Sequence, residues 1–72
     1  MGKDADLAIA RRYEHEAREC DQNANGTEQL LSRYQVGSSR DLARQYVDDM
    51  RNAAESARGM AKLHKARALK IA

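Results

Sequence analysis

The strongest constraint on the fold of this chain is a heptad pattern of mostly small residues between residues 43 and 71. These residues recur at alternating spacings of four and three, the periodicity of a helix face that packs along another helix. The members of this seam are Ala43, Val47, Met50, Ala54, Ala57, Ala61, His64, Ala68 and Ile71. Because alanine has a short side chain, the seam lets two helices approach closely, and we expect this segment to seek helical partners.

Two further helices are expected before the seam. Residues 4–24 carry apolar positions at spacings of three and four, which predicts a first amphipathic helix. Asn25 and Gly26 predict its end, because both residues tolerate positive φ. Thr27 suits the N-cap of a short second helix over residues 28–35.

The seam itself lies on a long C-terminal helix. The segment Val36-Gly37-Ser38-Ser39 predicts a chain break, and Ser38 with Asp41 resembles a capping box. A helix over residues 40–71 would then be about 48 Å long. We therefore expect one all-α domain over residues 1–72, a helical hairpin with a short middle helix and a long C-terminal helix. The first helix would be too short to cover the long one alone.

Size and composition favour an oligomeric helical bundle. A chain of 72 residues lies near the lower limit for independent folding, and its single cysteine excludes an intrachain disulfide. A second apolar stripe on the long helix makes the apolar arc wider than a two-stranded coiled coil requires. This stripe contains Leu42, Tyr46, Ala53, Met60 and Leu63. We expect a homo-oligomer in which burial between subunits supplies the missing stability.

The sequence favours a cytoplasmic protein that does not associate with membranes. Its one free thiol suits a reducing compartment. We find neither a signal peptide nor an apolar run long enough to span a bilayer.

Charge is distributed unevenly along the chain, although the formal net charge is only +2. Residues 1–37 carry five Lys/Arg against seven Asp/Glu, and residues 38–72 carry eight against four. The last 17 residues contain five cations and no acid. This asymmetry suits an anionic partner, and it equally suits a helix whose charges complement its own dipole.

The candidate ligand-binding residues are the cations of the long helix and two residues of the segment before it. Arginine and lysine grip phosphates, and tyrosine can stack on a nucleobase. The set is Arg44, Arg51, Arg58, Lys62, Lys65, Tyr34 and Arg33. We expect them to engage nucleic acid or a small nucleotide.

No catalytic or metal-binding signature is present in the sequence. It contains no Gly-rich phosphate loop and no nucleophile elbow. His15 and Glu19 have i,i+4 spacing, but a third strong ligand on the same helix face is lacking. We expect a non-enzymatic protein without a cofactor or bound metal.

Two other functions are compatible with the sequence. Residues 30–42 resemble the helix-turn-helix family, with a short apolar helix, a turn containing Val36 and Gly37, and a polar helix start. The resemblance implies a DNA-binding regulator with Arg44 near the groove and Arg33 on phosphate. Asp41 departs from the family pattern, which has an apolar residue there. The other alternative is an adaptor or inhibitor that docks a helix face on a larger enzyme.

Overall fold

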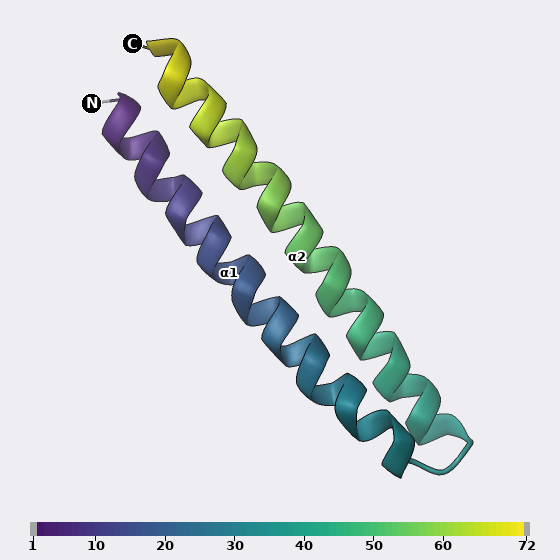
Figure 1. The fold of residues 1–72 in the computed structure, drawn as a ribbon. Helices are drawn as coiled ribbons and strands as arrows, with labels where there is room; N and C mark the ends of the chain where they lie inside the picture. Colours follow the sequence, from purple (N-terminus) through teal and green to yellow (C-terminus); the bar gives the residue numbers. More distant parts are fainter. Residues whose placement is uncertain (1, 72) are drawn as a thin grey trace.

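Two long helices make up nearly the whole chain in the computed structural model, which describes residues 2–71 apart from the side chain of Ile71. Helix α1 spans Gly2–Leu30, a 3-10 turn η1 spans Leu31–Arg33, and helix α2 spans Ser38–Ile71. The described residues include no strand, which confirms the prediction of an all-α chain. The helices lie side by side and antiparallel, so the first and last turns share one end of the molecule (Figure 1).

The molecule is a thin rod rather than a globule. Its described part measures 54 × 13 × 12 Å and has a Cα radius of gyration of 16.3 Å. A compact chain of this length would have a radius of gyration of roughly 11 Å. Most residues therefore lie at the surface, and the interior is a single line of contact between α1 and α2.

The first helix is longer than the sequence predicts. We expected it to end near residue 24, but α1 continues through Asn25 and Gly26 to Leu30. Asn25 and Gly26 are both exposed, whereas the flanking residues Ala24 and Leu31 are buried against α2. Packing on both sides of the pair therefore outweighs its weak helix propensity, which costs about 1 kcal/mol for the glycine.

The predicted short helix over residues 28–35 is replaced by the end of α1 and the turn η1. The turn is closed by a hydrogen bond that the Tyr34 amide donates to the Leu31 carbonyl at 3.2 Å. Gly37 has a φ of 152°, a conformation that disfavours side chains. Helix α2 begins at Ser38, two residues earlier than predicted, and the Asp41 amide donates to the Gly37 carbonyl at 3.1 Å. It continues through Gly59 without a break.

The core is made almost entirely of alanine. Seven alanines, one leucine and one valine are the buried apolar residues: Ala10, Ala17, Ala24, Leu31, Val47, Ala54, Ala57, Ala61 and Ala68. Those on α1 and η1 recur every seven residues from Ala10 to Leu31, and four on α2 recur likewise from Val47 to Ala68. The side chain of Ile71, the last seam position, lies outside the described residues.

The partner of the alanine seam is α1 of the same chain. With 29 residues against 34, α1 covers most of the length of α2, so the expectation that it is too short is wrong. The second stripe of α2 is different, because Leu42, Tyr46, Met60 and Leu63 remain exposed. Within the described chain, neither helix has an apolar stretch that would cross a bilayer.

Candidate anion-binding groove

Three ion pairs connect α1 to α2 along one flank of the rod. Glu14 pairs with Lys65, Asp21 with Arg58, and Glu28 with Arg51, the last at 2.5 Å between carboxylate and guanidinium. The acids are spaced by seven residues on α1 and the cations by seven residues on α2. This ladder repeats with the alanine core, so it favours one antiparallel register of the two helices.

Sequence reasoning misses the ladder because spacing along one helix relates each charge only to neighbours on the same helix. Arg18 lies four residues from Glu14 on α1, the spacing of an intrahelical pair, whereas the structure pairs Glu14 with Lys65. The signal was present as matching seven-residue spacings of acids on α1 and cations on α2. It becomes readable only when the two helices are known to run antiparallel along their seams.

A second polar cluster joins the two helices near the chain termini. Asp6 is buried, and its carboxylate lies 2.9 Å from His64 Nδ1 and 3.9 Å from Arg67 Nε. Tyr13 stacks on the His64 ring with centroids 5.9 Å apart. Because a buried carboxylate requires a compensating partner, this cluster explains why a histidine occupies one position of a seam that is otherwise apolar.

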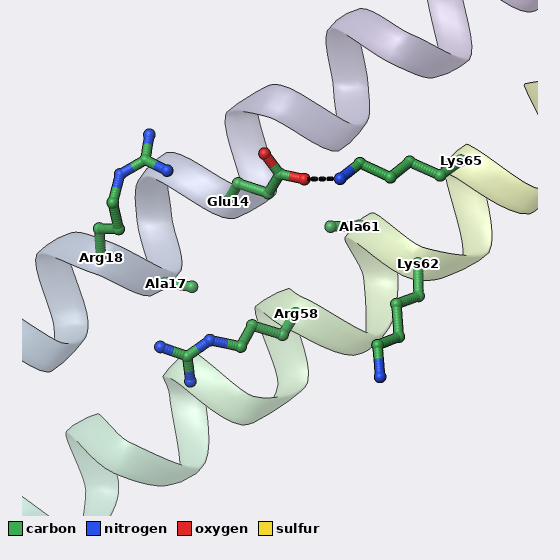
Figure 2. A pocket seen from close by; sticks show the side chains of 7 residues that line it. All are labelled: Glu14, Ala17, Arg18, Arg58, Ala61, Lys62 and Lys65. Atoms are coloured by element: carbon green, nitrogen blue, oxygen red, sulfur yellow. Dashed lines mark ion pairs between the residues drawn. The ribbon is translucent and has the colours of Figure 1, made fainter.

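An open groove lies between the helices beside the pair of Glu14 and Lys65 (Figure 2). Its volume is about 280 Å³, and the buried methyl groups of Ala17 and Ala61 belong to its lining. The full lining is Glu14, Ala17, Arg18, Arg58, Ala61, Lys62 and Lys65. Four cations and one carboxylate give this groove a formal charge of +3.

The four cations of the groove differ in their partners. Arg58 and Lys65 are engaged by acids of α1. Arg18 and Lys62 form no ion pair with any residue between 2 and 71 that the structure describes, and both are exposed. Their side chains point away from each other, Arg18 from α1 and Lys62 from α2 (Figure 2). These two residues therefore present charge that α1 and α2 do not neutralise.

The carboxylate of the groove is held in its charged form. The hydrogen bond with Lys65 lowers the pKa of Glu14 below its ordinary value of 4.5. The charges of Lys65, Arg18 and Arg11 act in the same direction, and burial opposes them. At neutral pH the groove therefore contains one fixed negative charge, which partly offsets its cations.

Of the seven ligand-binding residues expected from the sequence, three line the groove and four lie outside it. Arg58, Lys62 and Lys65 line the groove, and Arg51 lies one heptad away in its pair with Glu28. Arg44 lies a further heptad toward the turn. Arg33 and Tyr34 are exposed at the turn itself, at the far end from the termini. Arg18 lines the groove but was absent from the expected set.

The geometry around the turn differs from that of a helix-turn-helix. In that family the two helices meet at about 90–120°, and the second helix enters a groove of DNA. Here α1 and α2 run antiparallel on either side of the turn (Figure 1). Asp41 lies in the exposed first turn of α2, so its charge is not buried at a helix crossing.

The other polar groups on the surface have ordinary structural partners. His15 Nε2 lies 2.9 Å from Glu19 Oε1, and both side chains are exposed. Over the described part of the chain, no three or more His, Cys, Asp or Glu side chains are grouped so that they could hold a metal ion. Cys20 is half-buried beside the core formed by Ala17, Ala54 and Ala57.

Comparisons of this chain with protein families, with curated proteins and with solved structures return no match.

Proposed function

We propose that the protein is a non-enzymatic, self-associating helical binding protein that engages an anionic partner through the groove between α1 and α2. The observation that carries this proposal is the lining of the groove, where four cations surround one carboxylate and a small apolar floor. Arginine and lysine in such numbers favour phosphate or carboxylate groups over neutral ligands.

The size of the groove favours a phosphate backbone over an enclosed nucleotide. Its volume of about 280 Å³ falls just below the roughly 300–1,000 Å³ of pockets that enclose drug-sized ligands. An exposed phosphate of a polynucleotide fits such an open site, because the rest of the chain can remain in solvent. Binding of this kind is electrostatic and independent of sequence.

Three of the cations on α2 are already paired with acids of α1, so we expect only two or three phosphate contacts. For that number, raising salt from about 50 to about 200 mM should weaken binding to a single strand about seven- to eighteenfold. The measurement is fluorescence anisotropy of a labelled oligothymidylate titrated with the protein at several salt concentrations.

The variant that tests the groove is Arg18→Gln with Lys62→Gln. Neither residue forms an ion pair within the described chain, so helicity should be preserved. We expect loss of at least tenfold in affinity for oligothymidylate, about 1.4 kcal/mol. Arg33→Gln with Arg44→Gln is the matched control, because it removes the same charge at the turn end.

Each outcome of this comparison selects one function. If only the Arg18/Lys62 variant binds oligothymidylate more weakly, the result supports the groove as the binding site. If only the Arg33/Arg44 variant binds it more weakly, the result rejects the groove as the binding site and favours a DNA-binding regulator that uses the turn. Absence of polynucleotide binding by the unmodified protein rejects the proposal and leaves an adaptor that docks on another protein.

A further inference from the structure

Helix α2 has a row of exposed apolar residues that α1 does not cover. Leu42 is 66% exposed, Tyr46 41%, Met60 37% and Leu63 50%. With the exposed Ala53 between them, these residues follow helical spacing on one side of the alanine seam. We call this set the outer stripe. Large apolar side chains left in a row on a helix mark an interaction surface.

The spacing of the outer stripe is symmetric about Ala53 to within one residue. Tyr46 and Met60 lie seven residues before and after it, and Leu42 and Leu63 lie eleven before and ten after. The two polar positions on the same side follow the same symmetry, since Asp49 lies four residues before Ala53 and Ser56 three after it. A surface whose pattern reads alike in both directions is self-complementary, which a two-fold interface requires.

We infer that α2 packs against α2 of a second copy, antiparallel, about a two-fold axis near Ala53. This arrangement places Leu42 opposite Leu63 of the partner subunit, and Tyr46 opposite Met60 of the partner subunit. At the centre, Ala53 meets its own equivalent, where the short side chains allow close approach. The resulting dimer is a four-helix bundle with α2 at its centre.

The charges on this side of α2 are compatible with the two-fold arrangement. Asp49 is the one charged residue of the row between Leu42 and Leu63. The axis places it opposite Ser56 of the partner subunit, whose hydroxyl can donate a hydrogen bond to a carboxylate. No two like charges of the row are opposed, so the pairing avoids the repulsion that disfavours wrong registers.

The available area also suits a dimer. The rod is 54 Å long and 13 Å wide, so one face offers roughly 700 Å², near the roughly 800 Å² that each partner buries in a standard interface. Helix α2 spans residues 38–71, so Ala53 lies at its middle and the two subunits overlap along almost their full length. The alanine core of the single rod buries little apolar surface, and this contact adds the large side chains that it lacks.

This inference rests on the self-association in the proposed function and is independent of the groove. Its first test compares Leu63→Glu with Leu69→Glu by light scattering after size exclusion. Leu69 is 75% exposed but lies outside the outer stripe, so the two variants make the same chemical change on different sides of α2. We expect Leu63→Glu to raise the dimer dissociation constant at least about tenfold, and Leu69→Glu to change it little.

The second test is disulfide capture across the axis. In a Cys20→Ser background, Ala53→Cys should form a covalent dimer with diamide, because residues at a two-fold axis meet their own equivalents. Glu55→Cys, two residues away on another side of α2, is the matched control. Crosslinking of Ala53→Cys that is no faster than that of Glu55→Cys overturns the inference.

The outcomes separate this inference from the groove. A monomer at high micromolar concentration rejects both self-association and the outer stripe as its surface. A dimer that is equally sensitive to both glutamate variants rejects the outer stripe alone. Either result leaves the oligothymidylate comparison of Arg18/Lys62 and Arg33/Arg44 unaffected.

Discussion

Among the individual residues, Glu14 links the stability of the fold to the charge of the groove. Its carboxylate pairs with Lys65 across the two helices, and this pair lowers the pKa of Glu14 below its ordinary value. A carboxyl group whose pKa is lower in the folded state stabilises the fold above its unfolded pKa. That contribution is lost as pH falls from about 4.5 through the folded value.

We therefore predict that Glu14→Gln lowers the midpoint of thermal unfolding at pH 7 and has little effect at a pH below the folded pKa. The change is small because the pair is partly exposed to solvent. Circular dichroism melts of both proteins from pH 7 to pH 2.5 measure it. A difference between the two proteins that persists at the lowest pH contradicts this account.

The same substitution leaves the groove without its carboxylate and releases Lys65. Binding of oligothymidylate by Glu14→Gln should therefore be tighter at pH 7, in contrast to the Arg18/Lys62 variant. The substitution should therefore weaken the fold while it strengthens binding, which are opposite effects in the two assays. Glu14 thus distinguishes electrostatic binding in the groove from nonspecific effects of unfolding.

Among the helices and the turn, the glycines at positions 26, 37 and 59 differ in how a side chain would affect stability. A Cβ atom at Gly26 or Gly59 would meet nothing within 4 Å, and both residues are exposed inside helices. Gly37 also has space, but its φ of 152° lies in a region that side chains disfavour. Space is therefore equal at the three positions, and backbone conformation alone separates them.

We predict that Gly26→Ala and Gly59→Ala each stabilise the protein by about 0.5–1 kcal/mol. Gly37→Ala should destabilise it by about 1–3 kcal/mol, because alanine must adopt a strained conformation before α2. Urea unfolding followed by circular dichroism measures all three. Stabilisation by Gly37→Ala would show that the turn can relax to another conformation.

The seam and the helical class were readable from the sequence, because the three-four spacing of small residues reports a packed helix face directly. The boundary at Asn25 and Gly26 was not, since local propensity was outweighed by burial on both sides of the pair. Arg18 was absent from the binding residues expected from the sequence, because its position in the groove depends on the register of α1 against α2. Spacing within one helix cannot supply that register.

The alanine core determines how closely the two helices of the rod approach, and the ion-pair ladder makes one flank of the rod polar. Close approach of the helices leaves no large, fully buried side chain among the described residues. The flank with the ladder is polar and contains the groove, whereas the outer stripe lies on the opposite flank of the α2 seam. One flank therefore suits an anion and the other suits a second copy, so dimerisation need not block the groove.

This arrangement predicts the shape of the dimer in solution. Because the proposed axis lies at the middle of α2, pairing should double the scattering mass while the longest dimension stays close to the 54 Å of one rod. An end-to-end contact would instead nearly double the length. Small-angle X-ray scattering over a concentration series distinguishes the two, with the Leu63→Glu protein as the monomeric reference. A mass of two chains in a particle of about 100 Å would exclude the two-fold at Ala53, because full overlap of the rods cannot lengthen them.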